Sequence, residues 1–357
     1  MGLSRILALR APLAPFRAQK AVAAVALSLS VATAYIVCFA GAGYAGPLWL
    51  QILFALAVGP LIALLFRVAH DAGHGSHFAN VRLDRLTCRL SLLPSYHPHS
   101  VWLLLHNGRH HSFTNLRDND YIWIPYSKED YAALSAFGRF KARLYRTTPG
   151  TGLYYLFEIS LKMLTLRPSL VRKVKAVYVR DALIAVAFLL LQLVLLALDR
   201  PDISTFALRV TLAIVLPYLV FNWLVGFASF LNHTHPRVPW FSRREEWSFY
   251  EGQVHCTVHV VVPKWMVFFL TDLGLHGAHH IDPRIPIWKL EPAEARIVAD
   301  AGGEIVFEPW TFARHREIMR TCKLYDYDAH RWLDFAGRPT SAAIEIGRAS
   351  GHSGTAR

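Results

Sequence analysis

Four long apolar runs constrain the fold of this chain more than any other feature of its sequence. They occupy residues 21–40, 48–66, 182–198 and 210–231. Each is close to the roughly 20 residues that a helix needs to cross a bilayer. Of the 357 residues, 54% are hydrophobic and only 18% are charged, an apolar share above that of ordinary soluble domains. We therefore predict an all-α integral membrane protein with four transmembrane helices in two hairpins and a cytoplasmic helical cap.

The distribution of charge indicates how these helices are oriented. The formal net charge is +13, and the Lys and Arg residues flank the apolar runs, so an anionic lipid surface is a better partner than nucleic acid. Basic residues precede the first and third runs and follow the second and fourth. This pattern predicts a multi-pass protein with both termini cytoplasmic, in the plasma membrane if it is bacterial. The first run exceeds the about 7–15 apolar residues of a signal peptide, so we expect an uncleaved span.

The remaining segments are too polar or too interrupted to cross a bilayer. Residues 91–105 and 260–275 are expected to be buried or interfacial, and residues 139–165 to lie on the membrane surface. We divide the chain into a basic N-terminal segment (1–20), a membrane domain (21–290) and a cytoplasmic tail (291–357) that is frayed at its end. The four cysteines show no paired spacing, so neither a disulfide framework nor a cysteine zinc site is predicted.

Three histidine clusters, here called the first, second and third boxes, lie on the same predicted side of the membrane. Neutral imidazole is a common metal ligand, and residues three or four apart share one side of a helix. The first spacing alone could arise by chance, but two tight triplets in addition predict a metal centre. So many imidazoles exceed the ligands of one zinc ion and indicate two ions, for which two irons would suit activation of dioxygen. The box residues are His70 and His74; His106, His110 and His111; and His276, His279 and His280.

The sequence around these histidines resembles the membrane fatty acid desaturase family. The boxes read HDAGH, HNGRHH and HGAHH, in the family's order. The stretch LNHTHPRVPWFSRREEW (231–247) is similar to the segment before the last box in acyl-lipid desaturases, and HHIDPRIPIWKL (279–290) is similar to the family's HHLxPxIPxYxL. The resemblance covers about residues 45–295. The second box is one residue longer than the commonest HxxHH, which leaves His106 the least certain of its histidines.

This resemblance implies an enzyme that uses two iron ions and dioxygen to introduce a cis double bond into a fatty acyl chain on a lipid, coenzyme A or carrier protein. It implies that the eight box histidines and His233 bind iron and that Asn232 holds a water molecule near one ion. Hydroxylation, ketolation or triple-bond formation are alternatives within the same chemistry. A non-enzymatic metal carrier or haem-binding membrane protein is the alternative of a different class, although carriers tend to place their ligands inside the spans.

The electrons for this chemistry are expected from a separate protein. The sequence has no CxxC-type iron–sulfur motif, glycine-rich dinucleotide fingerprint or HPGG sequence of a fused b-type cytochrome. A separate ferredoxin or b-type cytochrome is therefore predicted as the donor. The basic residues between 139 and 180 would either dock an acidic partner or simply set the topology.

Several other polar residues have a less certain role. His77 is interpreted as a ligand, a partner of a ligand or a solvated residue. His235, His255 and His259 are expected to support ligands or cap helices. Aspartates beside the boxes could orient imidazole N–H groups; the candidates are Asp71, Asp120 and Asp272. The histidines expected at the surface are His97, His99, His315, His330 and His352.

Overall fold

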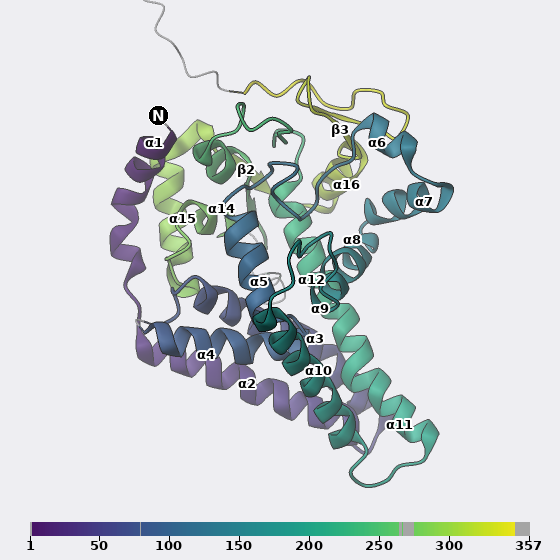
Figure 1. Cartoon of the computed structure of the whole chain (residues 1–357). Coiled ribbons are helices and arrows are strands. Elements are labelled where there is room, and N and C mark those ends of the chain that lie inside the picture. The colour runs from purple at the N-terminus through teal and green to yellow at the C-terminus, as the bar shows by residue number, and fades with distance from the viewer. Residues whose placement is uncertain (1, 79, 264–265, 267–274, 347–357) are drawn as a thin grey trace, which may run out of the picture.

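Four long apolar helices dominate the structure, a computed structural model that describes residues 2–78, 80–263, 266 and 275–346 (Figure 1). Within these residues the fold is mostly helical, and four helical segments are long and apolar enough to cross a membrane. Each overlaps one predicted run, so the prediction of four apolar helices is confirmed. The segments are α2 (Ala21–Tyr44), α3 (Leu48–Gly73), α10 (Ala176–Leu196), and Ile203–His233, which comprises α11 (Ile203–Val210), η5 (Thr211–Val215) and α12 (Leu216–His233).

The four segments differ in how much of their apolar surface is covered by protein. α3 and α12 pack against each other in the centre, where Ile62, Phe221 and Phe227 are buried. α2 and α10 lie outside them and leave large apolar side chains exposed, including Leu29 and Leu190. Such surfaces are stable when lipid covers them. Both α3 and α12 also extend beyond the predicted runs, and the additional residues include His70 on α3 and His233 on α12.

Shorter elements lie at one end of the long helices and are together called the cap, which excludes the two links 45–47 and 197–202 at the other end (Figure 1). The capping elements are α1 (Gly2–Arg10), η1 (Ala11–Arg17), α4 (Val81–Leu92), η2 (Leu93–Ser95), α5 (His99–Leu105), η3 (His106–His110), α6 (Lys128–Ala133), α7 (Ala136–Tyr145), α8 (Gly150–Tyr154), η4 (Tyr155–Ser160), α9 (Leu161–Leu164), η6 (Glu251–His255), α14 (His276–Ile281), α15 (Ile287–Ala301), η8 (Gly302–Glu304) and α16 (Phe312–Thr321).

Two small sheets correct the all-α prediction. β1 (Val258–Val261) pairs in parallel with β2 (Val306–Pro309), and β3 (Leu324–Asp326) pairs antiparallel with β4 (Arg331–Leu333). Strands of three or four residues are too short to show a clear alternation of apolar and polar side chains. The β1–β2 pair also joins segments that are far apart in sequence, so only tertiary packing reveals it.

The residues after 290 pack on the rest of the cap. α15 begins at Ile287, before the predicted boundary, and buries Leu290 and Ile297 against Ile6 and Leu13 from α1 and η1. In Figure 1 the purple α1 lies beside the light green α15. Arg17 Nε donates to Asp282 Oδ2 at 2.6 Å, just after α14. The N-terminal segment and the residues after 290 thus support the helix that carries the third box.

Candidate metal centre

Nine histidines, the eight box residues and His233, come together in two groups beside the cap end of α3 and α12. In each group every residue offers one ring nitrogen, and these nitrogens all lie within 4.8 Å of one another. The five-histidine group consists of His70, His74, His106, His111 and His279, and the four-histidine group of His110, His233, His276 and His280.

The first box lies at the C-terminal end of α3. His70 is in the last turn and His74 is the residue that ends the helix. The spacing of four residues places both rings on the side of α3 that faces the cap, and both belong to the five-histidine group. The continuation of α3 beyond residue 66 therefore carries the chain from its apolar run directly into the site.

The second box forms a π-helical turn, η3. The backbone N–H of His111 donates to the carbonyl of His106, five residues earlier, at 2.9 Å. A π turn accommodates one extra residue within a helix, which explains why a box longer than HxxHH still brings His106 to the site. His106 Nε2 lies 3.1 Å from His111 Nε2 and 3.1 Å from His74 Nε2. The neighbouring His110 points to the other group.

The third box divides its residues between the two groups in the same way. His276 and His280, four residues apart on α14, have Nε2 atoms 3.0 Å apart in the four-histidine group. His279 turns to the five-histidine group, where its Nε2 lies 3.1 Å from His111 Nε2. His233, the last residue of α12, completes the four-histidine group with its Nε2 3.0 Å from His276 Nε2.

Hydrogen bonds from outside the groups orient three rings of the four-histidine group. Asp120 Oδ1 lies 3.1 Å from His110 Nδ1, Gln253 Oε1 lies 3.1 Å from His280 Nδ1, and His233 Nδ1 lies 3.2 Å from the carbonyl oxygen of Cys256. When Nδ1–H donates, Nε2 keeps its lone pair for a metal. Although burial raises its pKa, the adjacent His110 and further hydrogen bonds keep the pKa of Asp120 below its ordinary value. Gln253 and the Cys256 carbonyl belong to no sequence motif and could not be predicted.

The donor set fits metal ions. Ligand nitrogens about 2.1 Å from an ion and at right angles to each other lie about 3 Å apart, which is the spacing of neighbouring Nε2 atoms here. Burial lowers the pKa of His74 to about 3. Burial and neighbouring imidazoles also hold the pKa values of other box histidines well below their ordinary range. The imidazoles are thus neutral and free to coordinate.

Asp71 does not orient a histidine ring as expected. Asp71 Oδ2 accepts the backbone N–H of Ile287 at 2.8 Å, and its other oxygen is 3.6 Å from His70 Nδ1, too far for a hydrogen bond. Asp71 therefore ties α3 to the start of α15. Of the two candidate aspartates within the described residues, Asp120 has the expected contact, and Asp272 lies outside these residues.

Histidines near the boxes have other partners. His77 hydrogen bonds to Ser28 Oγ at 2.8 Å and joins neither group. His235, His255 and His259 each contact a glutamate, respectively Glu308, Glu251 and Glu294. These three histidines belong to neither group, and their expected supporting roles remain predictions.

The prediction that five histidines lie at the surface was wrong for three of them. His97, His99 and His315 are buried. His97 hydrogen bonds to the Ser95 carbonyl at 2.8 Å. Isolated histidines give no periodic signal of burial, and tertiary packing alone covers them. His330 is half-buried, and His352 lies outside the described residues.

A cavity of about 110 Å³ adjoins both groups. This histidine cavity is lined by His70 and His106 of one group, His110 and His233 of the other, and apolar residues such as Leu224. Asn232 also lines it, and its side-chain oxygen is buried without a hydrogen-bond partner among the described residues. An unpaired buried acceptor suits a bound water molecule or ligand.

The fold and the site together define a helical protein with four apolar segments long enough to span a membrane and with two adjacent histidine groups that could each hold a metal ion. The sequence profile of the fatty acid desaturase family matches residues 47–308. The matched region contains all three boxes and His233, and the chain belongs to the fatty acid desaturase family.

Curated relatives agree with this assignment. The chain is 28% identical over 316 residues to an sn-1 oleoyl-lipid 12-desaturase from Picosynechococcus, covering 86% of this chain and 85% of the relative. It is 27% identical over 289 residues to a chloroplastic omega-6 fatty acid desaturase from Glycine max, covering 78% of this chain. The match spans less than two thirds of the plant relatives, namely 64% of the Glycine max protein and 59% of one from Spinacia oleracea.

Proposed function

We propose that this protein is a fatty acid desaturase that holds two iron ions and inserts a cis double bond into a fatty acyl chain of a membrane lipid. The observation that carries the proposal is the division of nine histidines, seven of them buried and two half-buried, into two groups that adjoin one cavity. The name of the Picosynechococcus relative, which refers to an oleoyl-lipid, supports a lipid-bound acyl chain as substrate.

In this proposal the five-histidine group holds one ion and the four-histidine group holds the other. Imidazole suits iron as a ligand, and the absence of a carboxylate from both groups leaves the ligand set neutral. Asn232, whose side-chain oxygen is unpaired, holds a water molecule beside the four-histidine group. Asp120 and Gln253 keep the rings of His110 and His280 oriented.

The reaction must balance electrons as well as atoms. Conversion of –CH2–CH2– to –CH=CH– with one O2, two protons and two electrons gives two molecules of water. Bound iron would activate the dioxygen and thereby supply the oxidant that removes hydrogen from two neighbouring carbons. The two electrons come from an external ferredoxin or b-type cytochrome.

The protein itself positions the chain and excludes water. Trp102, Tyr155, Phe66 and Leu224 line the histidine cavity and give it an apolar wall on the side of α3 and α12. An alkyl chain in contact with these side chains would lie next to His106 and His110. Removing water from this contact favours binding of the chain and prevents loss of the oxidant to solvent.

The proposed topology places the cap and both termini in the cytoplasm, with α2–α3 and α10–α12 forming two hairpins. The positive charge beside the cap ends of the spans supports this orientation. α1 and the C-terminal elements β3 and α16 lie at the same end of the long helices (Figure 1). A cytoplasmic cap would give a soluble electron donor access to the metal centre.

The decisive experiment combines iron analysis with the fatty-acid profile of a host that expresses the protein. We expect bound iron and an acyl product that has lost two hydrogen atoms. The His110→Ala variant should lose the product and the iron of the four-histidine group. A product that has gained an oxygen atom would instead identify a hydroxylase, whereas an unchanged profile together with iron-free protein would refute the proposal.

A further inference from the structure

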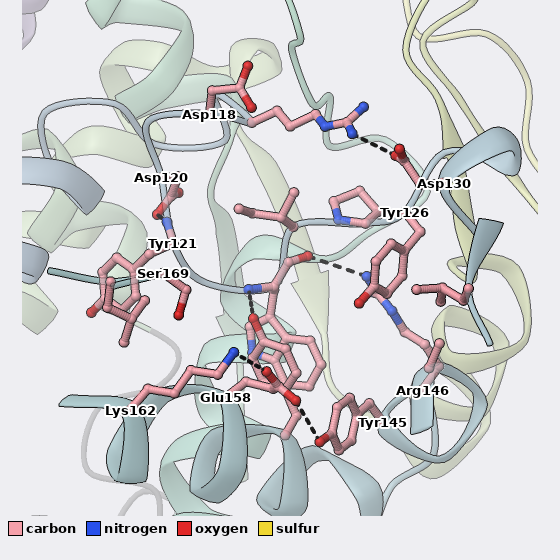
Figure 2. Close-up of a pocket in the computed structure, with 18 of the residues that line it drawn as sticks. Asp118, Asp120, Tyr121, Tyr126, Asp130, Tyr145, Arg146, Glu158, Lys162 and Ser169 are labelled. Carbon is pink, nitrogen blue, oxygen red and sulfur yellow. Dashed lines mark hydrogen bonds and ion pairs between the residues drawn. The ribbon is translucent and has the colours of Figure 1, made fainter. Parts of the chain in front are cut away.

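Two basic residues outside the metal centre, Arg146 and Lys323, lie where two cavities meet. One is the tyrosine pocket, a cavity of about 640 Å³ whose lining includes Tyr126, Tyr145 and Tyr154 (Figure 2). The other is the α16 groove, about 1490 Å³, between α16 and the long helices α3 and α12. Arg146 and Lys323 line both.

Arg146 is buried, and it forms no ion pair with a carboxylate of the described part of the chain. Its guanidinium lies over the rings of Trp123, Phe230 and Trp332 at 5.6, 5.7 and 5.8 Å. Nη2 donates to the carbonyl of Trp123 at 3.3 Å, a bond that is dashed in Figure 2, but Nη1 has no partner among the described residues. Aromatic rings stabilise a cation only modestly, so a buried guanidinium is normally completed by an anion.

Lys323 adds a second charge beside the first. Its Nζ donates to the backbone carbonyl of Arg146 at 2.8 Å. Burial and the neighbouring Arg146 lower the pKa of Lys323 to about 8, which still leaves it mostly protonated at pH 7. Glu158, an acidic residue that lines the tyrosine pocket, contacts Lys141, Tyr145 and Lys162 and forms no ion pair with either cation. The two cations therefore form a site with excess positive charge.

The α16 groove connects this charge to the metal centre. Its apolar floor comes from α3 and α12, where Leu56 is exposed on the surface of α3 and Leu224 lines both the groove and the histidine cavity. The groove thus begins at two cations in the cap, passes along apolar surface that lies within the spans, and ends one side chain from the histidines. This sequence of surfaces matches an anionic headgroup followed by an alkyl chain.

We propose that Arg146 and Lys323 bind the phosphate of a glycerophospholipid whose acyl chain occupies the α16 groove and passes Leu224 into the histidine cavity. The inference rests on the proposed function and narrows its substrate to lipids with an anionic phosphate headgroup. Arginine is well suited to this role because its planar guanidinium can donate two parallel hydrogen bonds to phosphate oxygens.

The test measures lipid binding to purified protein, with dioleoyl phosphatidylglycerol, dioleoylglycerol and inorganic phosphate as probes. We expect the phospholipid to bind at least about tenfold more tightly than dioleoylglycerol, the factor expected for hydrogen bonds to charged groups. Lys323→Gln and Arg146→Gln should remove this preference and leave dioleoylglycerol binding unchanged, which also shows that they are folded. Lys162→Gln, which removes a lysine already paired with Glu158, should keep it.

Three results would overturn the assignment. The first is equal binding of the two lipids by the unmodified protein, and the second is a preference for phospholipid that survives both substitutions. The third is binding of inorganic phosphate at this site as tightly as the phospholipid, which would indicate a site for a free anion. Because binding needs no turnover, failure here is distinct from failure of the proposed function. A protein that desaturates without preferring phospholipid refutes only this inference, and one that prefers phospholipid without desaturating refutes only the activity.

Discussion

At the scale of single residues, Asp120 is the clearest support for a proposed iron ligand. The Asp120→Asn change keeps the size of the side chain but replaces the carboxylate that lies 3.1 Å from His110 Nδ1. Losing such a partner typically lowers metal affinity or activity by about 10–100-fold. We expect a loss in this range, measured as iron retained against a chelator. Asp130→Asn, which affects a half-exposed ion pair with Arg117, should retain iron like the unmodified protein.

Lys323 should make phospholipid binding depend on pH. The groups that act on it are Arg146, which stays charged, and Cys322, a buried thiol that stays neutral. Since the charged lysine binds the phosphate and its pKa is about 8, affinity should fall several-fold as the pH rises from about 7 to 9. Lys323→Arg should flatten this profile because arginine keeps its proton. An unchanged profile in the unmodified protein would contradict the role of Lys323.

The sequence predicts box histidines well because each box is local. Residues four apart on an α-helix point to a common side, so His276 and His280 can be paired before any tertiary contact is known. Gln253, Arg146 and Lys323 behave differently. Their roles depend on which segments pack around them. A single polar residue in the sequence of the cap does not indicate which side chains or cavities it will contact.

At the scale of elements, we expect that the π turn of the second box can be replaced by an α-helical turn without loss of iron. Gly108 is exposed and lies within the turn between His106 and His110. Deletion of Gly108 leaves the sequence HNRHH. Because a π turn is one residue longer than the α turn that it replaces, this shorter box can form a regular α-helical turn with His106 still facing the five-histidine group. We expect the deletion variant to keep two irons per chain, as determined by elemental analysis.

The matched control for this deletion is an alanine inserted after Gly108. The insertion adds a second extra residue, which rotates His106 away from His111, and iron at the five-histidine group should be lost. Retention of iron at the five-histidine group by the insertion variant would show that the spacing of His106 and His111 does not position these ligands. Loss of iron from the deletion variant would show that the π turn is itself required.

The elements themselves were predictable to different degrees. The four apolar helices follow from composition and length, although the sequence placed the end of α3 near Phe66 and not at Gly73. The difference arises because the predicted apolar run ends before polar residues such as His70 and Asp71, whereas in the structure these residues continue the helix and are buried under the cap. The strands β1 and β2 could not be foreseen, since each is stabilised by a partner from a distant segment.

At the scale of the whole molecule, removal of metal should destabilise the protein. The ligands of the two groups come from α3, η3, α12 and α14, so bound ions would cross-link the spans to the cap. A ligand that binds only the folded state raises its stability. We expect chelation to lower the melting temperature by several degrees and ferrous iron to restore it. The same treatment should lower the melting temperature of the His110→Ala variant by less, because this variant lacks a ligand of the four-histidine group and keeps only the five-histidine group complete.

The division of two boxes between the groups would limit the separation of the two proposed ions. His110 and His111 are adjacent in sequence yet belong to different groups, and so do His279 and His280. Neighbouring Cα atoms are about 3.8 Å apart across a peptide bond. The peptide bonds of these two histidine pairs therefore limit the distance between the ion positions. Changes in bilayer thickness that tilt the spans would therefore move both ions together and leave their spacing nearly constant.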